Sequence, residues 1–382
     1  MADKKTKTYF LPSSLSAKRL QRTLSAAIQA RIPYNLVGDP GNGKSSLISA
    51  IAAELDYEVE TVIGRHMHPV EAAGLPIVIQ TDPENPTTVK ALPDWFRRAQ
   101  KVKRLVLFFD EFGNTSAATQ AALLVFIQER KIGHHKLPEE TVILMASNPI
   151  ETGSDEHPLT RPMANRIVHT VNIYNPDPED WFEGMACNWN QPSPSSRLIE
   201  ERARICAFLR QNVDLLDKGP ANDVEEAGAH PSRRSWDNLS RLLSFTQPDD
   251  IEVRDELIAG TVGSDAHLIF SVWDSEFNLP DIQSILDDPK SFDWENEEAD
   301  RIYAILGIIA GTVQNLDAMQ VAEVFLEAGK SENRQDIGAG LILSIIASIV
   351  SLGDEVSDKY FNQLTETYMP VLAGAGITNS RS

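Results

Sequence analysis

The chain has 382 residues, of which 42% are hydrophobic and 7% aromatic, and its formal net charge is −20. This length exceeds that of one ordinary domain, and the composition excludes long disorder and a fibrous design. Up to Asn175 there are 20 basic and 18 acidic residues, whereas the remainder has 15 basic and 37 acidic residues. The acidic second part disfavours binding to nucleic acid, and it fits either a solvated surface or a docking face for a basic partner.

The start of the chain and its longest apolar stretch indicate whether the protein is secreted or inserted in a membrane. Residues 1–8 are polar and lysine-bearing with no apolar segment after them, so we expect a cytoplasmic protein that is not secreted. Residues 341–352 are apolar except for three serines, and are far short of the ~20 residues that cross a bilayer. We expect them to form a buried helix and the protein to have no membrane span. Cys187 and Cys206 lack a second thiol or histidine at metal-ligand spacing, which predicts buried thiols in a reducing compartment.

The first 175 residues alternate apolar strand-like segments with helical segments, the pattern of a parallel sheet covered on both faces. Five strands are expected, at residues 34–37, 57–63, 104–109, 141–147 and 167–173. The third and fourth are nearly all apolar, as strands buried on both faces should be. Helices are expected at residues 16–31, 44–55 and 117–130. The sequence therefore predicts an α/β fold with a parallel five-stranded sheet.

A phosphate-binding loop follows the first expected strand and opens the next helix. Its residues match G-x-x-x-x-G-K-[ST] and are Gly38, Asp39, Pro40, Gly41, Asn42, Gly43, Lys44 and Ser45. The glycines let backbone amides turn toward phosphates, which the helix N-terminus also favours. Lys44 is expected to reach the β- and γ-phosphates and the Ser45 hydroxyl to bind Mg²⁺. Ser46, the next residue along the helix, is also expected at the nucleotide.

Polar side chains end the third and fourth expected strands. Asp110 and Glu111 follow the apolar third strand, where a Walker B element has its acids. Asp110 is expected to hold Mg²⁺ together with Ser45, and Glu111 to act as general base on the attacking water. Asn148 follows the fourth strand, at the sheet edge where open α/β sheets bind ligands, and is expected to orient the water or contact the γ-phosphate. Because asparagine before proline is also a common turn former, both interpretations of Asn148 stay open.

The rest of the chain is expected to be helical, because a proline-rich break at residues 175–178 ends the alternation. We predict five segments: a flexible tail at 1–14, an αβα core at 15–175, a helical lid at 176–280, an acidic linker at 281–298 and a C-terminal helical docking region at 299–382. The helices expected in the lid are 196–216, 234–245, 250–260 and 266–274. Those expected in the C-terminal region are 299–316, 318–329, 337–352 and 354–367.

Together these motifs resemble AAA+ ATPases of the MoxR and dynein-related branch, the group that includes the CbbQ and NorQ activators. The resemblance is carried by the phosphate loop and by Phe109-Asp110-Glu111, Ala146-Ser147-Asn148 and Asn165-Arg166. Three further stretches contribute: H-P-V-E-A-A-G-L-P from His68, residues 120–130 with Leu137-Pro138, and P-S-R-R-S-W from Pro231. The resemblance covers about residues 15–280.

The resemblance implies an AAA+ core with a helical lid, and ATP and Mg²⁺ as cofactors. It implies a ring, expected to be hexameric, in which Arg166 acts on the nucleotide of the neighbouring subunit and Arg234 contacts phosphate from the lid. Arg161 and Arg233 are the respective alternatives. A helix-2 insert at residues 64–95 and a hairpin near residues 131–136 are implied to face the pore of the ring.

Three hypotheses on function follow. The leading one is a Mg²⁺-dependent ATPase that remodels or activates a partner protein, for which the branch suggests a von Willebrand factor A-type partner. The second is a nucleic-acid motor similar to the McrB type, which would need a basic pore and which the acidic charge disfavours. The third is a switch that assembles with ATP and turns it over little.

Overall fold

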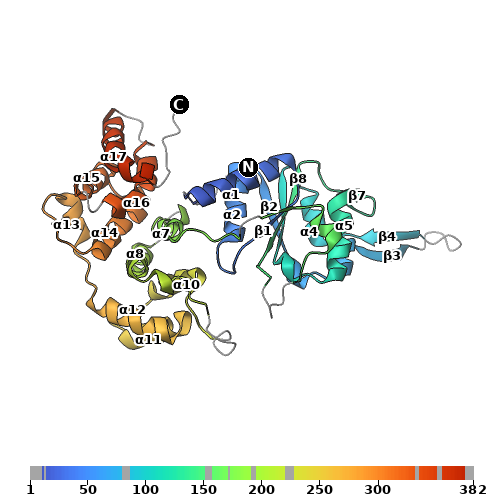
Figure 1. Ribbon diagram of the computed structural model, residues 1–382, viewed down its shortest axis with the longest axis horizontal. Helices are drawn as coiled ribbons and strands as arrows, with labels where there is room; N and C mark the ends of the chain where they lie inside the picture. Colours follow the sequence, from blue (N-terminus) through green and yellow to red (C-terminus); the bar gives the residue numbers. More distant parts are fainter. Residues whose placement is uncertain are drawn as a thin grey trace. The chain divides into compact units, whose positions relative to one another are not determined.

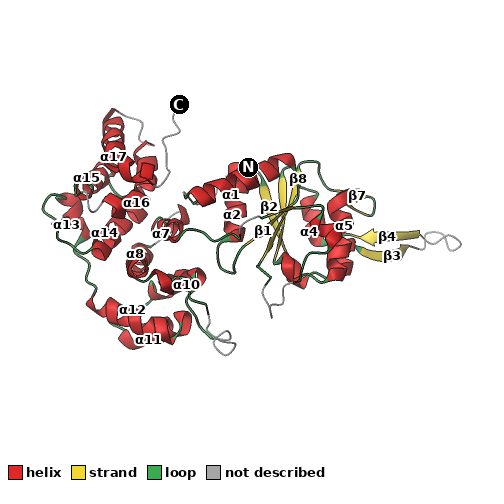
Figure 2. Ribbon diagram, viewed as in Figure 1, coloured by secondary structure: helices red, strands yellow, loops and turns green. Residues whose placement is uncertain are grey.

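The computed structural model describes residues 11–12, 14–79, 87–150, 157–170, 173–190, 195–219, 228–331, 335–350 and 355–374. The chain divides into two compact units, one of Met1–Leu11 and Lys18–Asn175 and the other of Pro12–Ala17 and Pro176–Ser382. Figures 1 and 2 show the elements of each unit. The predicted tail at residues 1–14 lies almost entirely outside the described residues. Within the described part of the chain, every helix is too short or too polar to cross a bilayer.

The first unit contains the predicted five-stranded sheet, which is parallel throughout and has the order β2-β5-β8-β1-β9. Its strands are β1 (Tyr34–Val37), β2 (Glu58–Ile63), β5 (Leu105–Asp110), β8 (Thr141–Ser147) and β9 (Val168–His169). The α/β prediction is thereby confirmed, but the fifth strand is shorter than residues 167–173. It ends because the Thr170 hydroxyl, rather than a backbone carbonyl, accepts the Val37 N–H at 3.1 Å. Residues 171–172 lie outside the described part.

The two buried central strands divide their side chains between the two faces of the sheet, as the alternation of a strand requires. On one face Val106 and Phe108 pack with residues of α1 (Leu15–Ala30) and α2 (Lys44–Glu54). On the other face Leu107 and Phe109 pack with α4 (Asp94–Ala99) and α5 (Ala117–Glu129). Helices α1, α2 and α5 match the prediction to within a residue, whereas α4 and α6 (Arg161–Ala164) are too short to have been predicted.

Two hairpins leave the sheet. Residues 64–95 contain η1 (Gly64–His66), α3 (Pro69–Ala73), and the antiparallel pair β3 (Leu75–Ile79) and β4 (Thr87–Ala91), which extends away from the sheet in Figure 1. All five β3 residues are exposed although four of them are large and apolar. A second hairpin, β6 (Lys131–Ile132) and β7 (His135–Lys136), lies where the resemblance implied one. That either hairpin faces a pore stays a prediction.

The second unit is helical in its described part, apart from its connecting segments. The predicted helices occur at nearly the expected residues, and α17 continues past residue 367, with Pro370 inside it. The α-helices are α7 (Pro178–Ala186), α8 (Ser196–Gln211), α10 (Arg233–Leu243), α11 (Ile251–Val262), α12 (Ser264–Glu276), α13 (Ile282–Asp287), α14 (Ala299–Thr312), α15 (Ala318–Ala328), α16 (Gln335–Val350) and α17 (Glu355–Gly374). The 3₁₀ turns are η3 (Asn188–Asn190), η4 (Val213–Leu215) and η5 (Val313–Asn315).

One hydrophobic core runs through this unit from Trp181 to Tyr368. It includes Ile285, Leu286 and Trp294 from the predicted acidic linker. The Trp294 indole N–H donates to the Pro289 carbonyl at 2.8 Å, so the one hydrogen-bond donor of this buried side chain has a partner. The division of this unit into a lid, a linker and a docking region stays a prediction. Leu341, Ile342 and Ile345 are buried in α16, so the apolar stretch at residues 341–352 does form a buried helix over its described part.

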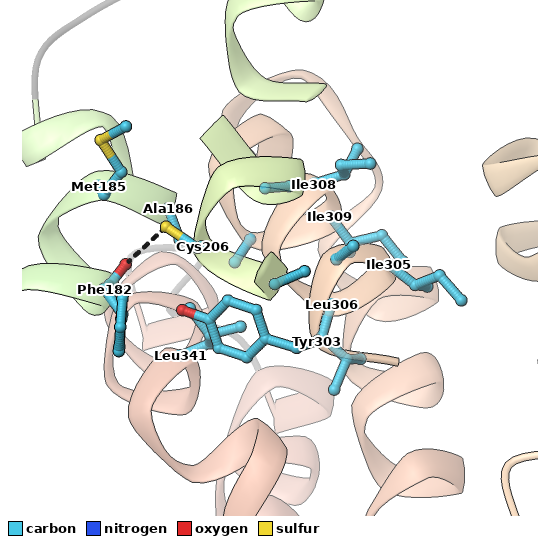
Figure 3. Close-up of a cluster of buried hydrophobic side chains, with 14 of the residues drawn as sticks. Phe182, Met185, Ala186, Cys206, Tyr303, Ile305, Leu306, Ile308, Ile309 and Leu341 are labelled. Atoms are coloured by element: carbon cyan, nitrogen blue, oxygen red, sulfur yellow. Dashed lines mark hydrogen bonds between the residues drawn. The ribbon is translucent and has the colours of Figure 1, made fainter. Parts of the chain in front are cut away.

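The two cysteines differ in environment. Cys206 on α8 is fully buried among side chains of α7, α14 and α16, and its thiol faces the Phe182 carbonyl (Figure 3). Burial raises the pKa of the Cys206 thiol, which keeps it protonated and unreactive. Cys187 follows α7 and is only partly buried, so the prediction of buried thiols holds for Cys206 alone. Both are free.

A chain of alternating charges ties α8, α11 and α12 together inside the second unit. Glu201 on α8 is 2% exposed and accepts from the two terminal nitrogens of Arg254 at 2.9 and 3.3 Å. Arg254 also donates to Asp274, and Arg197 and Arg204 complete the chain at its ends. Burial lowers the pKa of Arg254, but the hydrogen bonds and charge of Glu201 and Asp274 outweigh this, so the pKa is raised and the guanidinium stays charged.

Replacing Glu201 with leucine should destabilise the second unit by about 3 kcal/mol or more, because two arginines then lose a buried partner. The matched control is Asp265→Ala, which removes an exposed partner of Lys218 at 3.9 Å and should cost less than about 1 kcal/mol. Urea unfolding followed by tryptophan fluorescence measures the difference, since five of the six tryptophans lie beyond Asn175. Equal shifts in the two variants would show that the buried charges contribute no more than a surface pair.

Candidate functional site

The phosphate loop connects β1 to α2, as predicted. Its positions require glycine for two different reasons, a positive φ angle and a lack of space for a Cβ. Gly41 and Gly43 have φ angles of +84° and +75°, a backbone conformation that side chains disfavour, although a Cβ at either would have open space. A Cβ on Gly38 would lie 2.6 Å from the Tyr174 carbonyl, so no side chain fits there. Gly43 is also the N-cap of α2 and offers no capping side chain. The first amides of α2 are therefore available to an anion.

Lys44 is buried, and its ammonium is bound by the loop and by the sheet. It donates to the carbonyls of Gly38 at 2.6 Å and Asp39 at 2.9 Å, and to Asn148 Oδ1 at 2.9 Å. Three oxygen acceptors compensate the burial of this charge. The contact with Asn148 brings the end of β8 against the phosphate loop, as expected if Asn148 belongs to the site.

Ser45 and Asp110 meet on the other side of the loop. The Ser45 hydroxyl donates to Asp110 Oδ2 at 2.6 Å, while Oδ1 accepts the Glu111 N–H at 3.0 Å. Adjacent oxygens around an octahedral Mg²⁺ lie about 2.9 Å apart, so a small opening of this pair would admit the ion, and the residues fit it. No group of three or more histidine, cysteine or acidic side chains that could hold a metal occurs among the described residues.

Glu111 has a backbone conformation that sequence reasoning missed. Its φ and ψ are 51° and 39°, in the left-handed region, which costs a non-glycine residue about 1–2 kcal/mol. Its side chain is exposed and makes no hydrogen bond or ion pair with the described residues. Strain of this kind concentrates at functional sites, and here it occurs at a residue whose carboxylate makes no bond with the described residues.

Asn42 ties the phosphate loop to the last segment of the first unit. Its buried side chain donates to the Tyr174 carbonyl at 3.3 Å and to Asn175 Oδ1 at 3.4 Å. Tyr174 also pairs with Gly38, and its N–H donates to the Val37 carbonyl. The Asn42 side chain therefore supports the shape of the loop, a role without a sequence signal. Ser46 is exposed in the first turn of α2, and Pro40 is exposed in the loop.

The four candidate arginines differ in how they are held. Arg161 opens α6, is exposed and makes no side-chain bond within the described part of the chain. Arg166 follows α6 and donates to the Pro162 carbonyl at 2.7 Å. Arg233 is 4% exposed and is bound by Asp217 at 2.6 Å and by the Pro176 carbonyl at 2.9 Å, so it stabilises the second unit. Its neighbour Arg234 is exposed and, among described residues, unpaired.

A cavity of about 420 Å³ opens beside Asn148. Gly113, from the turn after Glu111, and Ser147 also line it, together with His157 and Ile173. The His157 N–H donates to the Gly113 carbonyl at 2.7 Å, which fixes one wall.

The fold and the meeting of Lys44, Ser45, Asp110 and Asn148 at one loop define a P-loop α/β unit with an additional helical region. Residues 34–168 match the model of the family described as "ATPase family associated with various cellular activities (AAA)". The first unit therefore contains an AAA ATPase domain, which supports ATP binding and ATPase activity in general. No curated protein matches the sequence.

Several solved structures are similar to this chain at low sequence identity and low TM-score. A point mutant of RuvB from Thermotoga maritima is 16% identical, with 97% of this chain and 92% of that chain covered and a TM-score of 0.38. A second RuvB structure from this organism, described as a Holliday junction branch migration motor, is 15% identical, with coverages of 96% and 91% and a TM-score of 0.35. NtrX from Brucella abortus is 15% identical, with coverages of 96% and 71% and a TM-score of 0.40. These similarities are too low to indicate function.

Proposed function

We propose that the protein is a ring-forming, Mg²⁺-dependent ATPase of the cytoplasm that remodels or activates a partner protein, as in the MoxR branch. The observation that carries the ATPase part is the convergence of two strand ends on the phosphate loop. Lys44 contacts Asn148 at 2.9 Å, and Ser45 contacts Asp110 at 2.6 Å. The ends of β5 and β8 thereby supply their polar side chains to the loop that follows β1.

The proposed roles follow from the chemistry of each group. The amides of residues 41–45 and Lys44 bind the phosphates, so Lys44 exchanges its loop carbonyls for phosphate oxygens. Ser45 and Asp110 hold Mg²⁺, which neutralises charge on the phosphates when bound. Glu111 accepts a proton from the attacking water, and Asn148 orients that water. The water oxygen bonds to the γ-phosphorus, the bond to the β–γ bridging oxygen breaks, and ADP and phosphate result.

The proposal also includes a site shared between subunits. AAA+ proteins usually assemble as rings, and we assign Arg166 to the nucleotide of the neighbouring subunit and Arg234 to phosphate contact from the lid. Arg234 is preferred over Arg233 because Arg233 is buried and already bound by Asp217. The acidic C-terminal helices are proposed to dock the partner, a von Willebrand factor A-type protein in this branch.

Client capture tests the proposed role. The Glu111→Gln protein, loaded with ATP and Mg²⁺, should retain a specific client on an affinity column, because it binds the nucleotide without completing hydrolysis. The control is Lys44→Ala in the same ATP, which lacks the phosphate-binding ammonium and should release the client. If both variants retain the same proteins in equal amounts, ATP-dependent action on a client is contradicted.

A further inference from the structure

Arg166 is held by two acceptors of its own subunit. Its Nη1 donates to the Pro162 carbonyl at 2.7 Å. The Gln128 side chain lies against the other edge of the guanidinium, and with its oxygen on that side it accepts from Nε at 2.7 Å and Nη2 at 3.0 Å. This amide orientation satisfies both groups, whereas the opposite one would put donors against donors. Gln128 thus forms a side-on pair with Arg166.

This arrangement restrains the Arg166 side chain but leaves some of its N–H donors and its positive charge available to another ligand. A guanidinium has five N–H donors, and the three contacts leave two for another ligand. Both acceptors are neutral, so the positive charge is not compensated. An arginine side chain loses up to about 2 kcal/mol of rotamer entropy when it is fixed. Much of the entropy cost of fixing Arg166 is therefore met before any phosphate binds. Arg161, which makes no side-chain bond with the described residues, has not met this cost.

The support for Arg166 comes from a rigid helix that follows the catalytic acids. Helix α5 begins soon after Glu111, and Leu123, Phe126 and Ile127 bury one side of it in the core. Two glutamines of α5 bind the α6 segment at its two ends. Gln120 Oε1 accepts the Thr160 N–H at 2.9 Å just before α6, and Gln128 binds Arg166 just after it. Helix α5 therefore fixes both the backbone that carries Arg166 and its side chain.

We propose that Gln128 is a positioning residue for Arg166, which it holds ready to meet the phosphates of the nucleotide bound by the neighbouring subunit. This inference rests on the proposed function, in which Arg166 acts across the subunit interface. Gln128 is itself exposed and is not part of the hydrophobic core. Its loss should therefore change the catalytic rate much more than the stability.

Mixed rings separate the two roles that one subunit plays. A Glu111→Gln subunit cannot hydrolyse its own ATP but presents an intact Arg166, whereas an Arg166→Ala subunit has intact catalytic acids. Mixing the two should restore ATPase activity at interfaces where Arg166 of the Glu111→Gln subunit contacts the nucleotide bound by the Arg166→Ala subunit. Gln128→Met, which keeps the side-chain length and removes the acceptor, is then placed in either subunit. In the Glu111→Gln subunit it should lower the restored kcat about tenfold with KM for ATP unchanged, and in the Arg166→Ala subunit it should change kcat less than twofold.

Each outcome bears on one proposal. If co-purification shows mixed rings but no activity returns, the shared site of the proposed function is wrong. Restored activity that Gln128→Met leaves unchanged, or lowers equally from either subunit, overturns the positioning role. Glu129→Met is the matched control, because Glu129 is the next exposed residue of α5 and, among the described residues, pairs with Lys131 at the surface. It should leave kcat unchanged in both subunits.

Discussion

The Glu111→Gln protein should bind ATP with unchanged affinity and hydrolyse it about 10²–10⁴ times more slowly than the wild type. Glutamine has the same shape but cannot accept the proton of the attacking water, and a general base contributes a factor of this size. The carboxylate makes no bond with the described residues, so its loss should leave the folded state as stable as before. Steady-state turnover, nucleotide binding and the melting temperature would be measured on the same preparation.

Two comparisons make this test decisive. Glu129→Gln changes another exposed acid of the first unit and should retain wild-type turnover. Glu111→Gly removes the carboxylate and also relieves the left-handed backbone at φ 51°, so it should be as inactive as Glu111→Gln. Wild-type turnover in the glutamine variant would contradict the assignment of Glu111 as general base.

Sequence analysis predicted the parts of the site that depend on short, local sequence patterns. The apolar runs before Asp110 and Asn148 predicted two strands buried on both faces, because such strands alone need no polar residues. The glycines and Lys44 predicted a loop between a strand and a helix, since only that context gives the motif its backbone conformation. In these cases one segment contains enough information to predict its own structure.

The remaining features depend on residues distant in sequence. Arg233 and Arg234 are adjacent and chemically identical in the sequence, and they differ because the folded unit buries the first and binds it through Asp217 and the Pro176 carbonyl. The fifth strand was predicted too long because the Thr170 side chain replaces a ladder partner. Gln128 had no signal at all, since its partner Arg166 is 38 residues away. Pairing of side chains from different helices and strands can be predicted only once the tertiary structure is known.

The Arg166→Ala protein should lose about 10³–10⁵ in kcat, because an arginine that meets the transferring phosphoryl group in trans contributes this much. The loss corresponds to about 4–7 kcal/mol of transition-state stabilisation. ATP binding should persist, because Lys44, Ser45 and Asp110 belong to the other side of the site. Wild-type turnover per subunit should also rise with protein concentration as subunits assemble, and that of the variant should not.

Arg161→Ala is the control that decides between the two arginines beside α6. Arg161 is exposed and unbonded within the described residues, so its removal costs the isolated subunit nothing and affects turnover only if Arg161 reaches the neighbour. We expect it to keep kcat within a few-fold of wild type, because an unrestrained side chain is poorly preorganised for a transition state. If Arg161→Ala loses turnover and Arg166→Ala does not, Arg161 acts in trans. The bonds of Arg166 to Gln128 and Pro162 then only support the fold.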